Sequence, residues 1–277
     1  MRPSPMKSET PLPTPPQFLK SIAQRTGLAP PPFDAALTPD GTVFAVGDIH
    51  GRADLLDRLI DMLPPEGTIV FLGDYVDRGQ DSSGVLRRLF ELETRSAGRI
   101  TCLMGNHERM MLNFMENPEA GGDQWLRNGG RETLASFGFA HVPDRPNPVE
   151  AQDLTDGLRA AVGTALHDWL AGLPLQHQSG NVHFVHAGAN PTAALDAQRP
   201  EHLIWGHPAF HKAPRRDGQC VVHGHTIVDE AHATDGRIAT DTGAWFTDRL
   251  TAARICPGGV TFMATAGASD GAEEIRP

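Results

Sequence analysis

The sequence predicts a fold of the α/β class, in which short buried strands alternate with amphipathic helices. Apolar runs containing β-branched residues stand at 43–46, 69–72 and 100–104, and a glycine follows each of them directly. Between these runs, 52–63 and 82–93 carry apolar residues at the spacing of one helix face. Because ligands bind outside the carboxyl ends of strands in open α/β sheets, the loops after these runs are the expected location of a functional site.

The rest of the chain divides by composition. Residues 1–40 are rich in proline and predict a flexible N-terminal arm, with a docking arm for a partner as the alternative interpretation. Residues 41–265 are expected to form the main folded domain. Within it, 117–181 contains no ligand motif and predicts a mainly helical insertion that caps the site. Short strands dominate after residue 183, and 266–277 predict a flexible tail.

Charge and cysteine usage limit the classes of partner and compartment. The formal net charge is −10, which argues against nucleic acid as a partner because phosphate backbones bind basic surfaces. Three cysteines (Cys102, Cys220 and Cys256) show no paired spacing, as expected for a reducing cytoplasm. No apolar run reaches the roughly 18–20 residues of a membrane span. The N-terminus also lacks the apolar core of a signal peptide. We therefore expect a soluble, cytoplasmic protein with no membrane partner.

Five short polar strings follow the predicted strands. They are Gly-Asp-Ile-His-Gly at 47–51, Gly-Asp-Tyr-Val-Asp-Arg-Gly at 73–79, Gly-Asn-His-Glu at 105–108, His-Ala-Gly at 186–188 and His-Gly-His-Thr at 223–226. If the strands end at one sheet edge, six side chains of these strings converge on one point: Asp48, His50, Asp74, Asn106, His186 and His225. One such string is a weak signal, whereas five in succession at strand ends predict a metal site.

The types of ligand predict a pair of catalytic ions. Carboxylate, imidazole and amide oxygen, without thiolate, suit Mn, Fe or Zn rather than a structural zinc site. Six ligands exceed the needs of one ion with an open position, but they divide well between two, because one carboxylate can bridge both. Two-metal sites hold their ions roughly 3.5–4 Å apart and clamp the attacking and leaving oxygens of a phosphoryl displacement. We expect two divalent ions here, with manganese as the first choice and iron or zinc as alternatives.

With these strings in this order, the chain resembles the phosphoprotein phosphatases of the binuclear metallophosphoesterase superfamily. It is most similar to their single-domain bacterial and phage members. The resemblance runs from about residue 43 to 255 and includes the segments 125–130, 203–205 and 241–244. It implies a central β-sandwich of mixed sheets flanked by helices, which refines the α/β prediction. It also implies a metal-dependent phosphomonoesterase of the protein serine/threonine phosphatase type, with a phosphoprotein or a small phosphoester as substrate.

The resemblance also implies roles for individual residues. The first ion is held by Asp48, His50 and the bridging Asp74, and the second by Asp74, Asn106, His186 and His225. Direct attack by a metal-activated hydroxide is expected, without a covalent intermediate. The catalytic residues are His107, which protonates the leaving oxygen, and Asp77, which orients its ring, while Arg78 grips the phosphate. The chemistry agrees, because imidazole has a suitable pKa for a proton donor and guanidinium presents a fork to phosphate oxygens.

Three departures from the family pattern bear on the substrate. Ile227 stands where cyclic nucleotide phosphodiesterases carry a second histidine, and His50 stands where diadenosine tetraphosphatases usually have glutamine. Both differences favour a phosphomonoesterase. His207 occupies a place where bacterial relatives tend to have a second phosphate-binding arginine. Arg52 and the two arginines at 215–216 are alternative candidates for this second phosphate contact.

Two other functions are compatible with the sequence. The first is a dinucleoside polyphosphate or other small-phosphate hydrolase that uses the same site. The second, of a different class, is a catalytically silent phosphatase-like protein that binds partners through its proline-rich arm.

Overall fold

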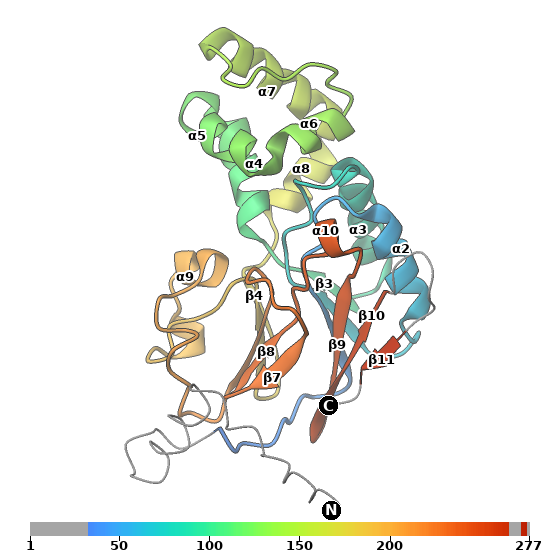
Figure 1. Ribbon diagram of the computed structural model, residues 1–277, viewed down its shortest axis with the longest axis vertical. Helices are drawn as coiled ribbons and strands as arrows, with labels where there is room; N and C mark the ends of the chain where they lie inside the picture. The colour runs from blue at the N-terminus through green and yellow to red at the C-terminus, as the bar shows by residue number, and fades with distance from the viewer. Residues whose placement is uncertain (1–32, 266–272, 276–277) are drawn as a thin grey trace, which may run out of the picture.

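The protein is a sandwich of two sheets that face each other, as seen in a computed structural model that describes residues 33–265 and 273–275 (Figure 1). The six-stranded sheet has the order β11-β10-β9-β1-β2-β3, and the five-stranded sheet has the order β4-β5-β6-β8-β7. The strands of the first are β1 (Val43–Val46), β2 (Thr68–Phe71), β3 (Ile100–Cys102), β9 (Thr251–Cys256), β10 (Gly259–Ala264) and β11 (Glu273–Ile275). Those of the second are β4 (Gln176–Ser179), β5 (Val182–Val185), β6 (Cys220–His223), β7 (His232–Thr234) and β8 (Arg237–Ala239). The predicted sandwich of mixed sheets is therefore confirmed.

Each sheet contains three neighbouring parallel strands. In the six-stranded sheet these are β1, β2 and β3, and in the other they are β5, β6 and β8. The loops that follow them are joined by backbone hydrogen bonds, such as Ile49 N–H to the Asp74 carbonyl at 3.0 Å and Gly224 N–H to the His186 carbonyl at 2.8 Å. The carboxyl ends of parallel strands meet at one edge, so both sheets deliver their polar loops to the same end of the sandwich.

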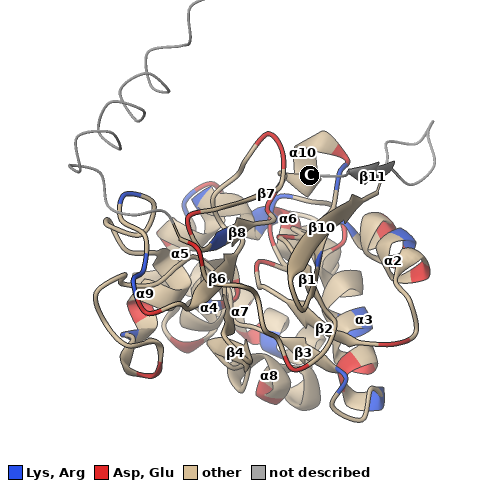
Figure 2. Cartoon of the chain, turned by 90° about the horizontal axis from the view of Figure 1, so that it is seen from below, with Lys and Arg blue, Asp and Glu red and all other residues tan. Residues whose placement is uncertain are grey.

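Alternation of side chains along β1 explains why both of its faces are apolar. Val43 and Ala45 belong to the core between the sheets, whereas Phe44 and Val46 belong to the core beneath the helices. Successive side chains of a strand point to opposite faces, and a strand covered on both faces is apolar throughout. Most charged residues consequently lie on helices and loops around the strands (Figure 2).

Two helices cover the outer face of the six-stranded sheet (Figure 1). These are α2 (Ala53–Met62) and α3 (Ser82–Arg95), close to the predicted ranges. Helix α3 begins where the Asp81 carboxylate accepts a hydrogen bond from Gly84 N–H at 2.8 Å. The five-stranded sheet is accompanied by the 3₁₀ turn η2 (Leu195–Ala197) and α9 (Pro200–Trp205), while α10 (Ala244–Thr247) follows β8.

A helical lobe extends beyond the polar end of the sandwich (Figure 1). It comprises α4 (Asn106–Glu116), α5 (Pro118–Trp125), the π-turn η1 (Leu126–Gly130), α6 (Arg131–Ser136), α7 (Pro148–Val162) and α8 (Thr164–Ala171). Helix α7 starts with proline at its first turn and a reciprocal cap between Asn147 and Glu150. The region 117–181 is mainly helical, but its last residues form β4 and belong to the sheet.

The folded part of the chain begins earlier than the predicted boundary at residue 40. Phe33 and Leu37 pack against the core between the sheets. Thr38 N–H donates to Asn181 Oδ1 at 2.7 Å, and Asp40 N–H donates to Ser179 Oγ at 2.9 Å. These apolar and polar contacts fix 33–40 to the turn between β4 and β5. The rest of the proposed arm, 1–32, lies outside the described residues.

The predicted tail also contains regular structure. Its residues Glu273–Ile275 form β11, which pairs antiparallel with β10. The other positions of the tail lie outside the described residues. Among the helices within 33–265, none has both the length and the apolar character required to span a membrane.

The docking of 33–40 can be tested with two glycine substitutions. Gly180 has a φ of +56°, and a Cβ there would overlap the Thr38 carbonyl oxygen, whereas Gly98 has a φ of +85° and open space around it. Both Gly180→Ala and Gly98→Ala should lose about 1–2 kcal/mol of stability from the left-handed backbone. Gly180→Ala should lose at least about 1 kcal/mol more because residues 38–39 must move away. Chemical denaturation of the two variants measures the difference, and equal losses would contradict this docking.

Candidate metal centre

The loops at the polar end of the sandwich hold several non-glycine residues in the left-handed region. The φ values are +45° at His50, +54° at Asp74, +75° at Asp77, +67° at Arg78 and +60° at His225. Each such residue costs about 1–2 kcal/mol. Backbone strain of this kind persists only where surrounding contacts determine the conformation, and it clusters at functional sites.

Glu108 provides many of those contacts. Its buried carboxylate accepts hydrogen bonds from the backbone N–H groups of Asp74 at 2.8 Å, Tyr75 at 2.7 Å, Val76 at 3.2 Å and Gly105 at 2.9 Å. Burial, followed by the charge of Asp74, raises the pKa of Glu108 to about 7. Sequence reasoning gave this residue no role. The available signal was its position three residues after Gly105, where a glutamate reaches back across a helix start.

Asp74 lies between two groups of potential ligands. Its Oδ2 is 3.7 Å from His50 Nε2, and its Oδ1 is 3.3 Å from His186 Nε2. His186 Nε2 is in turn 2.8 Å from Asn106 Oδ1 and 3.2 Å from His225 Nδ1. Ligands about 2.0–2.2 Å from an ion are separated from each other by distances of this order. The two oxygens of Asp74 thus face different histidines, as a bridging carboxylate requires.

Backbone carbonyls fix the histidine rings of this cluster. His50 Nδ1 lies 2.8 Å from the Val76 carbonyl oxygen, and His186 Nδ1 lies 3.0 Å from that of Leu72. A carbonyl only accepts, so both rings carry their proton on Nδ1, and Nε2 keeps a lone pair that can bind a metal. Burial lowers the pKa of His50 to about 3, which keeps its ring neutral and available to a metal.

Asp48 lies beside a second buried carboxylate, Asp241. The carboxylate oxygens of Asp48 accept a hydrogen bond from the backbone N–H of His225, at 3.0 and 3.1 Å. Burial, together with the charges of Asp241 and Asp74, raises the pKa of Asp48 well above its usual range. Three neighbouring buried carboxylates are unfavourable without a cation, so this donor set fits divalent metal ions. The sequence pointed to Asp241 only as part of the segment 241–244, without predicting a role for it.

His107 is held by Asp77 at the edge of this cluster. Its Nδ1 lies 2.6 Å from Asp77 Oδ2. Burial by itself lowers the pKa of His107, but the charge of Asp74 and the hydrogen bond to Asp77 outweigh it and raise the pKa. His107 Nε2 is 3.8 Å from Asp74 Oδ2, so by geometry alone this ring is also close enough to be a ligand.

The helical lobe positions Asp77 in turn. Trp125 Nε1 donates to both carboxylate oxygens at 3.0 Å, and Thr133 Oγ1 donates to Oδ1 at 2.6 Å. Both residues are fully buried and come from the region 117–181. No pattern in the sequence identified either of them as a contact of Asp77, because their approach depends on how the lobe packs.

Arg78 extends its guanidinium across the cluster. Nη1 lies 3.1 Å from His50 Nε2 and Nη2 lies 3.2 Å from His107 Nε2. The guanidinium also sits 5.7 Å from the ring centroid of Trp245 on α10. Its two arms therefore point at the space that a phosphate beside Asp74 and His107 would share.

The other candidates for a phosphate clamp lie elsewhere or are engaged. His207 stacks edge-on with His202, with ring centroids 4.6 Å apart, and its Nδ1 accepts from Ala209 N–H. Arg215 is buried against Asp217 and backbone carbonyls. Arg52 lines the same cavity as Arg78 but forms ion pairs with Asp54 and Asp248. Of these three residues, Arg52 is the one that shares a cavity with Arg78.

The profile of the calcineurin-like phosphoesterase family matches residues 41–241. The chain therefore belongs to this family, whose members hydrolyse phosphoesters. The family and the side chains around Asp74 together indicate divalent metal ions at this site.

Individual relatives carry different activities in their names. The symmetrical bis(5'-nucleosyl)-tetraphosphatase of Paracidovorax citrulli is 31% identical over 162 residues, which is 56% of this chain and 47% of that protein. Serine/threonine-protein phosphatase 2 of Escherichia coli is 36% identical over 91 residues, 32% of this chain and 38% of that protein. The chain thus spans less than half the length of these curated relatives.

A solved structure supports the fold. The serine/threonine phosphatase from Saccharomyces cerevisiae superposes with a TM-score of 0.55 at 16% identity, covering 84% of this chain and 82% of that one. At this level of identity the likeness concerns the arrangement of sheets and helices.

Gly224 offers a test of the place of Asp48 in the cluster. A Cβ at Gly224 would overlap Asp48 Oδ1, whereas one at Gly259 would meet open space. Gly224→Ala should displace the carboxylate and lower metal affinity about 10- to 100-fold, the usual effect of disturbing contacts around a metal site. Gly259→Ala should bind metal normally. Titration calorimetry and metal analysis of purified protein measure both, and unchanged affinity in Gly224→Ala would exclude Asp48 from the metal site.

Proposed function

We propose that the protein is a metal-dependent phosphomonoesterase that acts on phosphoserine or phosphothreonine in proteins. The observation that carries this proposal is the Asp77–His107 pair, which stands within reach of both Asp74 and Arg78. This geometry supports the proposed roles of His107 as proton donor and of Arg78 as phosphate-binding group, because the two side chains are in contact. A phosphoester hydrolase needs both functions, and a non-catalytic binding protein has no use for the first.

The side chains divide the work as follows. Arg78 donates two N–H groups to the phosphate and holds its position. Asp77 accepts the Nδ1 proton of His107, so that Nε2 can carry the proton given to the leaving alkoxide. Two divalent ions, when held by Asp48, His50, Asp74, Asn106, His186 and His225, would supply positive charge and a nucleophile from water. Manganese is the ion we propose, because oxygen and nitrogen ligands without thiolate suit it.

The proposal of a phosphomonoester as substrate depends on His50, in the loop 47–51. His50 is buried and its Nε2 faces Asp74 Oδ2, which is consistent with a ligand role where diadenosine tetraphosphatases usually have glutamine. The second candidate function, hydrolysis of dinucleoside polyphosphates, is favoured by the 31% identity to the Paracidovorax citrulli protein over 56% of this chain.

A direct comparison of substrates decides between the two. Manganese-loaded protein should hydrolyse phosphoserine and phosphothreonine peptides with kcat/KM at least about tenfold above that for diadenosine tetraphosphate, a difference of about 1.4 kcal/mol in transition-state stabilisation. A preference for the dinucleotide would replace the first proposal with the second. Inactivity toward both, with two ions bound, would point to a binding protein.

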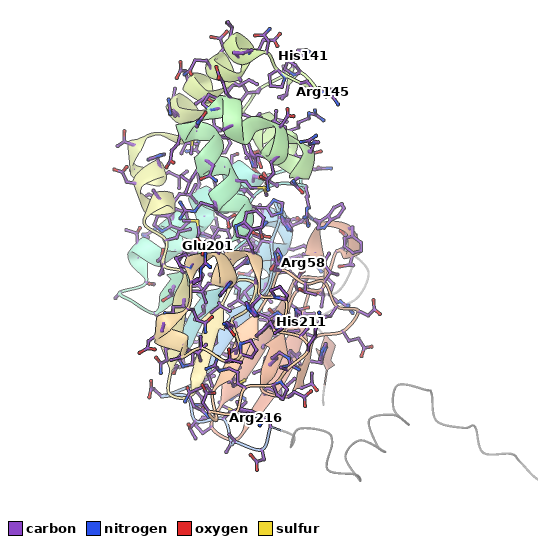
Figure 3. The ribbon with its side chains drawn as sticks, turned by 90° about the vertical axis from the view of Figure 1, so that its left-hand side faces the viewer. Arg58, His141, Arg145, Glu201, His211 and Arg216 are labelled. Carbon is purple, nitrogen blue, oxygen red and sulfur yellow. The ribbon has the colours of Figure 1, made fainter. Side chains whose placement is uncertain are left out.

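The role of His107 makes a further prediction. His107→Asn should lower turnover of phosphopeptides by about 10²–10⁴-fold, the usual contribution of a general acid. The loss should be much smaller for an aryl phosphate with an acidic phenol, because that leaving group needs no proton. His141→Asn, at the far tip of the lobe (Figure 3), is the matched control and should be fully active.

Metal analysis belongs to the same experiment, because the His107 ring is also close enough to Asp74 to be a ligand. Normal metal content with an unequal loss on the two substrates supports proton donation. Loss of an ion from His107→Asn, with equal losses on both substrates, would make His107 a ligand instead.

A further inference from the structure

A cavity of about 530 Å³ opens beside Arg78, and no histidine is among its lining residues. Its walls come from four places: the start of α2, the loop before α3, Arg78 itself and α10. Arg78 is therefore shared between this cavity and the metal centre. A substrate whose phosphate lies against Arg78 must place a neighbouring part of its structure here.

One wall of the cavity is formed by the aromatic ring of Trp245. Trp245 remains 39% exposed although the Arg78 guanidinium lies over its ring, and the adjacent Phe246 is 54% exposed. The two rings meet at a centroid distance of 5.0 Å. Tryptophan is the side chain with the strongest attraction for a cation over its face, and the contact with Arg78 shows that a guanidinium fits there.

The remaining walls carry carboxylates. Arg52 pairs with Asp54 at 2.7 Å and with Asp248, yet these two acidic side chains stay 59% and 62% exposed. Asp81 contributes a third carboxylate to the lining. Once Arg78 is committed to a phosphate, three carboxylates stand against one guanidinium, that of Arg52.

We propose that this cavity binds a cationic side chain, arginine or lysine, that flanks the phosphorylated residue of a protein substrate. The inference rests on the proposed function and narrows its substrate class to phosphoserine or phosphothreonine sites next to a basic residue. The aromatic wall and the carboxylates both favour a cation. The same carboxylates repel the additional phosphates of a dinucleoside polyphosphate.

Matched phosphopeptides test the proposal. One series carries a single arginine moved stepwise along the positions on either side of phosphothreonine, and the other carries glutamine at the same positions. At the best position the arginine peptide should have a kcat/KM about three- to tenfold higher than its glutamine counterpart, the size expected from one cation–π contact and one exposed ion pair. This ratio should fall toward one at high salt, because exposed charges are screened.

Variants of the cavity locate the effect. Trp245→Leu and Asp248→Asn should each lower the arginine-to-glutamine ratio, and the ratio cancels any general loss of activity. Asparagine suits position 248, where φ is +59°. Asp57→Asn is the matched control, because Asp57 is also exposed and pairs with an arginine, Arg88, and neither residue lines the cavity. It should keep the full ratio.

Two results would overturn the proposal in different ways. Efficient hydrolysis of both series with equal kcat/KM, or a ratio unchanged in Trp245→Leu and Asp248→Asn, rejects the cationic pocket and leaves the proposed function intact. Failure to hydrolyse any phosphopeptide, while diadenosine tetraphosphate is cleaved, rejects the proposed function and this inference with it.

Discussion

The arrangement of the site depends on the carboxylate of Asp74. Its Oδ1 accepts His107 N–H at 3.0 Å and faces His186, which follows a strand of the five-stranded sheet. Its Oδ2 faces His50, which follows a strand of the six-stranded sheet. Burial by itself raises the pKa of Asp74, but the charges of His186 and His107 outweigh it and hold the pKa well below its usual range. One buried negative charge therefore links both sheets, and the loops around it adopt strained backbone to reach it.

The sequence predicted the part of the site that follows from strand ends. An apolar run followed by glycine marks where a buried strand stops, and Asp48, Asp74 and Asn106 stand directly at such stops. These positions could be predicted because the rule is local. The contacts of Trp125 and Thr133 with Asp77 could not, since they depend on how a lobe of several helices packs against the second loop. The early start of the fold at Phe33 has the same explanation, because it depends on packing against the core between the sheets. The proline-rich composition of the region predicted a flexible arm instead.

The helical lobe has a chemical consequence as well as a structural one. Trp125 and Thr133 both donate to Oδ1 of Asp77, the oxygen that His107 does not use. A buried carboxylate with satisfied hydrogen bonds keeps its position, and its partner ring then keeps one tautomer. Movement of α5 and α6, which carry Trp125 and Thr133, would loosen this pair. The lobe therefore supports the proposed proton-transfer pair, while five of the six proposed ligands follow strands of the sandwich and the sixth, Asn106, begins α4.

The stability of the fold and the binding of metal are coupled through the acidic end of the site. Asp48 and Asp241 are buried side by side, and burial raises the pKa of both. The guanidinium of Arg78 offsets these charges only in part, because it is directed at His50 and His107. A cation bound there lowers the free energy of the folded state only, and the stabilisation by any ligand specific for the folded state grows with the logarithm of its concentration. The strained loops and the crowded carboxylates are thus tolerable in the form of the protein that carries metal, and this is the form in which the site can act.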